Sequence, residues 1–110
     1  MPVVRPRPAF ERAVTDRLLW LQENAPEEWL DRFLSALEEL EREIERSPEA
    51  SPVVMRDERV VLRQRRLPGG LPYFVYYTHP REDPISEVFL SRLFHERQRR
   101  PRLRPARWPW

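Results

Sequence analysis

The chain has 110 residues, 35 % of them charged and 40 % hydrophobic, which is enough for one small domain with a single modest core. It has no apolar run near the roughly 18 residues of a membrane helix and no basic-then-apolar leader, so we expect neither a membrane span nor a secretory signal. The absence of cysteine excludes disulfides and thiol catalysis and fits a cytoplasmic location. Two histidines, His79 and His95, are too few to predict a histidine-rich metal site.

The net charge of +2 hides a strong asymmetry along the chain. Residues 11–49 carry 12 acidic side chains against 5 arginines, whereas residues 92–110 carry 7 arginines against one glutamate. All 20 basic residues are arginine, whose planar guanidinium can donate two hydrogen bonds at once to a phosphate or a carboxylate. We therefore expect the C-terminal end to attract nucleic acid or an acidic protein.

Two proline-free stretches predict a pair of helices. None of the 13 prolines lies between Ala9 and Ala25 or between Glu27 and Ser47, and a proline inside a helix costs about 3 kcal/mol. In both stretches apolar residues recur at helical spacing. Pro26 stands between them, where the first turn of the second helix is expected. Two antiparallel helices joined by a tight connection follow from this pattern.

Strand patterns follow the helices, over residues 58–67, 73–78 and 86–94. The only two glycines lie in the turn 68–72, and residues 79–84 form a second turn. Residues 3–7 are short and alternating and can add an edge strand. The order β-α-α-β-β-β predicts an α+β fold, in which a helical hairpin packs on one face of a small, mostly antiparallel twisted sheet.

The chain divides into a single domain over residues 1–98 and a tail over residues 99–110. The tail contains five arginines, three prolines and two tryptophans, and cannot form a core of its own. Its composition suits an arm that contacts RNA or a segment that docks a protein partner. Trp108 and Trp110 can equally fold back and cover the sheet.

Three sets of motifs resemble the RelE/ParE superfamily of toxins from bacterial type II toxin–antitoxin systems. The helical hairpin opens with R-P-A-F at residues 7–10 and turns through E-N-A-P at 23–26. The strand pair reads R-R-L-P at 65–68 and P-Y-F-V-Y-Y at 72–77, and the last strand closes with L-F-H-E-R at 93–97. The strand motifs are similar to those of the ParE-like branch.

The resemblance implies a compact α+β toxin that a partner antitoxin wraps with a helix or an extended segment. In the RelE-like branch, arginines with a tyrosine, histidine or glutamate on the open sheet face cut messenger RNA in the ribosome. The ParE-like branch poisons DNA gyrase and has no nuclease chemistry of its own. One fold therefore supports two different activities.

Arg63 and Arg65 are two residues apart on a strand, so both are expected to project from one face. We expect Val60 and Leu62 to face the helices, which leaves the two arginines on the open face. There they can grip phosphate or an acidic partner. The alternative is a solvated strand face that pairs with local carboxylates.

His95 closes the last strand beside Arg97, Arg99 and Arg100. As a general acid or base it can act on a ribose 2′-hydroxyl while an arginine stabilises the phosphorane. If the chain is an endonuclease, His95, Arg65 and Arg97 are the expected catalytic residues. The alternative is a histidine that closes the strand through a structural hydrogen bond.

The remaining candidates favour structural roles. Core packing is the better prediction for Tyr73, Tyr76 and Tyr77, because aromatic residues dominate central strands. His79 is predicted to lie solvated in a turn. Glu58 can serve as a carboxylate base, but a surface role is favoured.

The sequence leads to one main functional hypothesis and two alternatives. The main hypothesis is a cytoplasmic ParE-like toxin that inhibits DNA gyrase and is neutralised by an acidic antitoxin. The first alternative is a ribosome-dependent mRNA endonuclease of the RelE-like branch, and the second is a non-toxic RNA-binding protein. None of them requires a metal, an organic cofactor, a membrane or a small-molecule substrate. The partner-binding or nucleic-acid-binding residues are expected to be Arg63, Arg65, Arg97, Arg99 and Arg100.

Overall fold

A computed structural model describes residues 2–83 and 86–98. The predicted tail of residues 99–110, with Arg99 and Arg100 in it, lies outside the described residues. The described chain forms, in order, β1 (Val3–Pro6), α1 (Pro8–Asn24), α2 (Glu27–Arg46), β2 (Val53–Arg56), β3 (Val60–Arg66), β4 (Tyr73–Pro80) and β5 (Glu87–His95).

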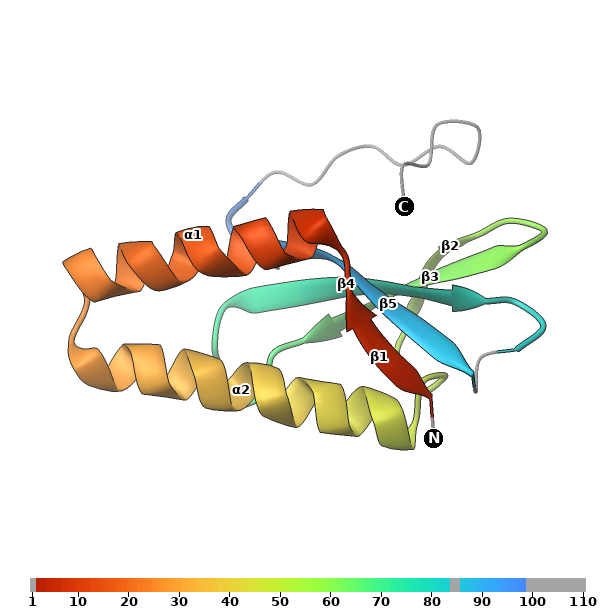
Figure 1. Ribbon diagram of the computed structural model, residues 1–110, viewed down its shortest axis with the longest axis horizontal. Helices are drawn as coiled ribbons and strands as arrows, with labels where there is room; N and C mark the ends of the chain where they lie inside the picture. The colour runs from red at the N-terminus through yellow and green to blue at the C-terminus, as the bar shows by residue number, and fades with distance from the viewer. Residues whose placement is uncertain (1, 84–85, 99–110) are drawn as a thin grey trace.

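The strands of the described chain form one mixed sheet in the order β1-β5-β4-β3-β2. β1 runs parallel to β5, with Val3 opposite Glu87, and the other neighbouring strands are antiparallel. The two helices run antiparallel to each other and are joined at one end, away from β1 (Figure 1). The predicted α+β fold, with a helical hairpin on a mostly antiparallel sheet, is confirmed. No helix among the described residues is long and apolar enough to cross a membrane.

The hairpin follows from the positions of its prolines. Pro8 occupies the first turn of α1, where the missing N–H costs nothing because that group has no partner within a helix. Ala25 has an extended backbone and Pro26 precedes α2, so the chain reverses between the helices. Glu27 and Glu28 then place carboxylates at the positive end of the α2 dipole.

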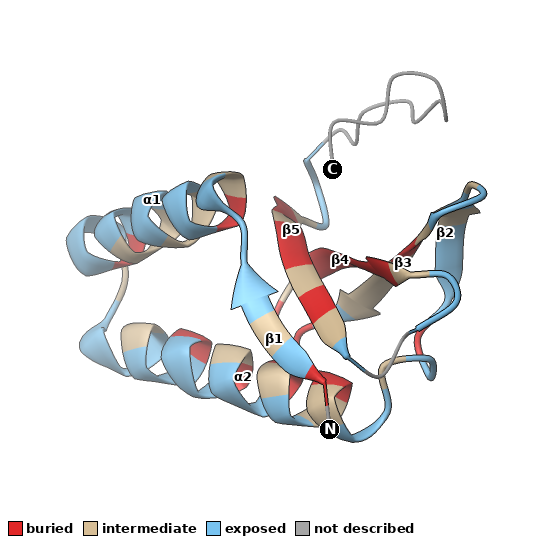
Figure 2. Cartoon of the chain, turned by 45° about the vertical axis from the view of Figure 1, so that its right-hand side comes forward, coloured by how far each residue is buried: buried red, intermediate tan, exposed pale blue. Residues whose placement is uncertain are grey.

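The main core lies between the helices and one face of the sheet. Tyr73, Val75 and Tyr77 alternate along β4, and Phe33, Ala36, Leu40 and Ile44 recur about once per turn of α2, where Figure 2 shows buried segments in red. Phe33 and Tyr73 pack edge to face, with ring centroids 5.2 Å apart. The buried members are Phe10, Leu21, Phe33, Ala36, Leu40, Ile44, Leu67, Leu71, Tyr73, Val75, Tyr77, Val88, Leu90 and Leu93.

A second, smaller cluster lies on the opposite face of the sheet. It consists of Leu62, Tyr76 and Phe94, with Met55 packed against it, and neither helix contributes a residue. The prediction that Leu62 faces the helices is therefore wrong. The odd-numbered residues of β3 face α2, because the β3–β4 register pairs Arg65 with Val75 of the main core.

The short strand β2 was not predicted from the sequence. Its four residues carry no strong alternation, and Pro52 precedes them. The turn into β3 is closed by Asp57, whose Oδ1 accepts hydrogen bonds from the backbone N–H groups of Arg59 (2.7 Å) and Val60 (2.8 Å). These two bonds lower the pKa of the Asp57 carboxyl group.

The turn between β3 and β4 uses the chain's two glycines. Gly69 and Gly70 have φ angles of 81° and 75°, in the left-handed region that costs little only for glycine. Leu67 and Leu71 on either side are buried in the main core, so the turn is held at both ends. The prediction of a turn over residues 68–72 is confirmed.

Replacing Leu40 by alanine should lower the free energy of unfolding by about 2–5 kcal/mol, because the substitution leaves a cavity in a close-packed site. Leu40 has no exposed surface in the main core, whereas Leu34 on the same helix is 39 % exposed. Leu34→Ala is the matched control and should cost much less. Urea unfolding of both variants checks this, and equal losses would contradict the assignment of the core.

Candidate functional site

Arg63 of β3 lies in a polar network on the helix-facing side of the sheet. Its Nε donates to Nε2 of His79 (2.9 Å), and its Nη1 donates to the carbonyl oxygens of Ser51 (2.7 Å) and Glu49 (3.1 Å). His79 is 2 % exposed within β4, so the prediction of a solvated turn histidine is wrong. The ring and the guanidinium are hydrogen-bonded to each other in a partly buried setting.

Arg65 belongs to the same network. Its Nε donates to the carboxylate of Glu43 on α2 (2.9 Å), and its Nη1 donates to the hydroxyl of Ser51 (3.0 Å). The Tyr77 hydroxyl donates to the carbonyl oxygen of Pro48 (2.7 Å), and burial raises the pKa of this phenol. The network fastens the segment between α2 and β2 to the sheet.

Arg63 and Arg65 share a face, as predicted, but that face is the one the helices cover. Both guanidinium groups already donate to acceptors within the chain, including the carboxylate of Glu43. The expected placement of these arginines on an open sheet surface is therefore wrong. The physical cause is the parity of β3, in which Leu62 rather than Arg63 turns away from the helices.

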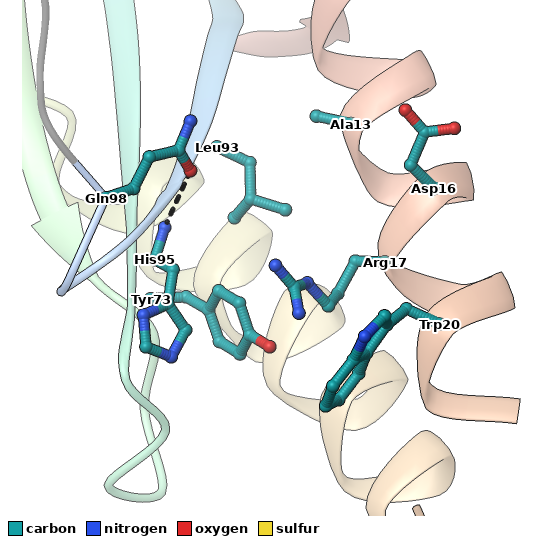
Figure 3. Close-up of a pocket in the computed structure, with 8 residues that line it drawn as sticks. All are labelled: Ala13, Asp16, Arg17, Trp20, Tyr73, Leu93, His95 and Gln98. Atoms are coloured by element: carbon teal, nitrogen blue, oxygen red, sulfur yellow. Dashed lines mark hydrogen bonds between the residues drawn. The ribbon is translucent and has the colours of Figure 1, made fainter. Parts of the chain in front are cut away.

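His95 lies beside a pocket of about 340 Å³ between α1 and the end of β5 (Figure 3). In Figure 3, Arg17 and Trp20 reach from α1 toward Tyr73, and His95 lies on the other side of the Tyr73 ring. The Arg17 guanidinium is 5.1 Å from the Trp20 ring centroid and 5.3 Å from that of Tyr73. The pocket is lined by Ala13, Asp16, Arg17, Trp20, Tyr73, Leu93, His95 and Gln98.

The His95 ring makes contacts that fix its position at the strand end. Its Nδ1 accepts a hydrogen bond from the backbone N–H of Arg97 (3.1 Å), so the neutral ring carries its proton on Nε2. The ring also packs edge to face on Tyr73, with centroids 5.3 Å apart. Burial raises the pKa of the Tyr73 phenol, and Arg17 opposes that shift.

The predicted catalytic residues are not brought together in one place. Arg65 contacts the α2 side of the sheet, His95 lies against Tyr73 near α1, and Arg97 is exposed beyond the end of β5. Within residues 2–83 and 86–98, no hydrogen bond or ion pair joins Arg65 to His95.

The face of the sheet that carries no helix has a different set of arginines. The strand registers place Arg66, Phe74, Tyr76, Phe89, Arg92 and Phe94 on this side, and Arg7 reaches it from the start of α1. We call these seven residues the arginine–aromatic face. It combines fixed positive charge with flat aromatic rings, on the side of the sheet opposite the His95 pocket.

Two arginines of this face lie over aromatic rings. The guanidinium carbon of Arg7 is 4.1 Å from the Phe89 ring centroid, and that of Arg66 is 5.3 Å from the Phe74 centroid. Arg66 also pairs with the carboxylate of Glu96 at 3.0 Å. These two groups lie toward opposite edges of the sheet, because Arg7 and Phe89 belong to the β1–β5 side and Arg66 to β3.

Between these groups the face is more buried. Tyr76 and Phe94 pack edge to face, with centroids 5.0 Å apart, and are 4 % and 6 % exposed. Arg92 lies opposite Tyr76 in the β4–β5 register. Burial lowers the pKa of the Arg92 guanidinium, and nearby Arg12 lowers it further, but arginine keeps its charge at neutral pH.

Alternating arginine and aromatic groups suit single-stranded nucleic acid. Arginine can neutralise phosphate, and an aromatic ring can stack on a base of any sequence. Arg66 was not predicted from the sequence, because the wrong parity was assigned to β3, and neither Arg7 nor Arg92, which lie outside β3, was predicted as a site residue. The correct parity of β3 follows from its pairing with β4. Tyr73, Val75 and Tyr77 of β4 face the main core, and the register pairs Arg63 with Tyr77 and Arg65 with Val75, so the two arginines lie on that same side.

Comparisons with known proteins support the fold. No protein-family model and no curated protein matches the chain. One solved structure, the crystal structure of an archaeal RelE–RelB complex from Pyrococcus horikoshii OT3, is similar with a TM-score of 0.52 and 17 % sequence identity. The match covers 89 % of this chain and 98 % of the other. At this identity it shows a shared fold, and it agrees with the fold expected from the sequence motifs.

Arg65→Gln and Arg66→Gln form a matched pair, because the residues are neighbours on β3 and face opposite sides of the sheet. Arg65→Gln removes partly buried, charge-assisted hydrogen bonds and should lower the free energy of unfolding by about 1–3 kcal/mol. Arg66→Gln removes an exposed ion pair and should cost about 0–1 kcal/mol. Urea unfolding measures both values, and a larger loss for Arg66→Gln would contradict the two assigned environments.

Proposed function

We propose that the chain is the toxin of a type II toxin–antitoxin system and that it arrests growth by acting on messenger RNA at the ribosome. The observation that carries this proposal is the arginine–aromatic face, which lies on a fold shared with the chain of an archaeal RelE–RelB complex. A surface of this composition suits RNA better than a folded protein, because its rings can stack on unpaired bases.

In this proposal Arg7 and Arg66 move off the rings of Phe89 and Phe74 and contact phosphates. The two uncovered rings then stack on bases. The exposed Arg66–Glu96 pair opposes this exchange only weakly, because surface ion pairs contribute little to stability. Arg92, held at the centre of the face, supplies charge that does not have to be reoriented on binding. Such preorganised charge can stabilise a phosphorane during cleavage.

The proposed partner is an acidic antitoxin. The similar solved structure is a complex of RelE with RelB, which supports a protein partner for this fold. Arg63 and Arg65, expected from the sequence to bind the partner, already donate to acceptors within the chain. Of the arginines expected to bind the partner, Arg97 is exposed at the end of β5 and is the clearest contact for an acidic segment.

Inhibition of DNA gyrase is the second candidate. It rests on the strand motifs at residues 65–68, 72–77 and 93–97, which are similar to those of ParE-like toxins. On this hypothesis the arginines of the arginine–aromatic face are contact residues and have no catalytic task.

Expression of the chain without an antitoxin should stop protein synthesis before DNA synthesis. The measurement is pulse-labelling of new protein and new DNA within minutes of induction. If DNA synthesis stops first, the ribosome proposal is wrong and the gyrase candidate takes its place. Unimpaired growth at confirmed expression would contradict both toxins and favour a non-toxic RNA-binding protein.

Arg66→Gln tests the arginine–aromatic face. The variant should weaken the arrest at least tenfold, measured as the amount of protein needed for half-inhibition of translation in an extract, because one charge-assisted phosphate contact is lost. Arg59→Gln is the control, since Arg59 is exposed in the β2–β3 turn and off this face. Equal inhibition by both variants would place the RNA contact elsewhere.

The proposed role of His95 as a general acid or base has a separate test. If His95 transfers a proton, His95→Ala should abolish RNA cleavage and leave RNA binding unchanged, measured on one labelled RNA in ribosome complexes. Tyr73 packs against the ring, so urea unfolding of the variant serves as the control for folding. Unchanged cleavage by a folded variant would assign His95 to closure of the strand instead.

A further inference from the structure

A second pocket adjoins the His95 pocket on the helix side of the sheet. It has a volume of about 270 Å³, and Trp20, Tyr73 and His95 line both pockets. Small-molecule sites in proteins have volumes of roughly 300–1,000 Å³, a range that two adjoining pockets of this size reach. We call the second one the tryptophan pocket, because Trp20 and Trp29 both line it.

The His95 pocket holds two hydrogen-bond donors that meet no acceptor within residues 2–83 and 86–98. Tyr73 is only 6 % exposed, yet its hydroxyl makes no hydrogen bond to any described residue, and in Figure 3 it points toward Arg17. The Arg17 guanidinium lies over the rings of Trp20 and Tyr73 and has no carboxylate or carbonyl partner in the described chain. Buried polar groups normally have a hydrogen-bond partner, so these donors favour a ligand that accepts.

The charge of these groups favours an anion. Arg17 stays positive at neutral pH, and burial, which raises the pKa of the Tyr73 phenol, keeps its proton in place to be donated. His95 adds its Nε2–H, because its Nδ1 already accepts from the backbone of Arg97. A guanidinium beside a hydroxyl matches a phosphate or a carboxylate, and hydrogen bonds to such charged groups are roughly twice as strong as neutral ones.

The remaining walls favour a nucleotide over an acidic peptide. Trp20, Trp29 and Phe33 give the tryptophan pocket aromatic surface, on which a base of any sequence can stack. Asp16 lines the His95 pocket and offers an acceptor for a sugar hydroxyl (Figure 3). A nucleotide carries an anion, hydroxyl donors and a flat ring in one molecule, and so matches all of these walls.

We propose that the two pockets together bind one nucleotide, with its phosphate on Arg17 and the Tyr73 hydroxyl and its base in the tryptophan pocket. A free nucleoside monophosphate and a nucleotide of an RNA strand share this chemistry. The site lies on the helix side of the sheet, away from the arginine–aromatic face, so the proposal does not depend on the function proposed above.

Adenosine 5′-monophosphate is the probe for this site, titrated into the full-length chain by calorimetry. It should bind with one-to-one stoichiometry and shift the indole N–H signal of Trp20 in the ¹⁵N-labelled protein. Adenosine, which lacks the phosphate, and ribose 5-phosphate, which lacks the base, should each bind at least tenfold more weakly. Absence of binding by adenosine monophosphate, or equal binding by adenosine, would overturn the proposal.

The phosphate contacts are tested by two substitutions. Tyr73→Phe removes the hydroxyl and keeps the ring that packs on Phe33 and His95. Both Tyr73→Phe and Arg17→Gln should weaken adenosine monophosphate about tenfold and leave adenosine unchanged, because each removes one hydrogen bond to a charged group. Arg42→Gln, exposed on α2 and outside both pockets, is the matched control and should change neither affinity. Unchanged affinity in both test variants would place the phosphate elsewhere and reject the site.

The base contact has its own pair of variants. Trp29→Ala should weaken adenosine monophosphate and adenosine alike, by about tenfold, because a stacking ring is lost. Leu19→Ala also removes an exposed apolar side chain of the helical hairpin, but Leu19 lines neither pocket, so both affinities should stay unchanged. Equal affinities of the two variants would contradict the placement of the base.

An adenylate hexamer distinguishes the two sources of the nucleotide. Displacement of bound adenosine monophosphate by the hexamer would assign the site to a nucleotide of RNA, and retention would assign it to free nucleotides; both results keep the nucleotide site. An acidic, leucine-containing peptide tests the competing occupant. A Trp20 indole signal that responds to this peptide and not to adenosine monophosphate would assign the pockets to a protein partner and overturn the proposal.

Discussion

The structure depends on the fact that two helices cover only one face of the sheet. Two helices side by side can cover one face of a small sheet. Here they bury a core cluster whose members run from Phe10 to Leu93 in the sequence. The opposite side has to be stabilised in another way. It carries a small apolar cluster around Leu62 and, around that, arginines stacked on aromatic rings. Stability and a charged, accessible surface are thus divided between the two faces of one sheet.

The two faces also explain why adjacent arginines of β3 differ so strongly. Arg65 meets the carboxylate of Glu43 and the hydroxyl of Ser51 in a partly buried setting, where charged hydrogen bonds are worth the most. Arg66, one residue later, lies on the other side over Phe74. The partly buried hydrogen bond between Arg63 and His79 lies on the same side of the sheet as Arg65. Successive side chains of β3 thus point alternately toward the helices and toward the helix-free face.

Much of the fold could be predicted from the sequence because helices and turns leave local signals. The proline-free stretches marked both helices, and the two glycines marked the β3–β4 turn. The short strand β2 has no comparable signal, since four residues after a proline do not show a period. Its existence depends on pairing with β3, which is a tertiary contact.

The candidate site was harder to predict than the fold. A one-residue change in parity moves every side chain of a strand to the other face, and the apolar residues at positions 60–62 fit either choice. The wrong choice placed Arg63 and Arg65 on the surface and hid Arg66. His79 was misjudged for a related reason, since β4 extends through Pro80 and carries the ring into the interior. Only the register of β3 against β4 separates these possibilities.

The parallel pairing of β1 with β5 has a consequence for the order of assembly. Val3 pairs with Glu87, so the first strand to be synthesised waits for the last one before it can join the sheet. Contacts so distant in sequence form late, because closing the long intervening loop costs entropy that earlier contacts do not repay. The stacking of Arg7 on Phe89 belongs to the same late step. A ribosome that makes this chain therefore has to complete β5 before the arginine–aromatic face exists.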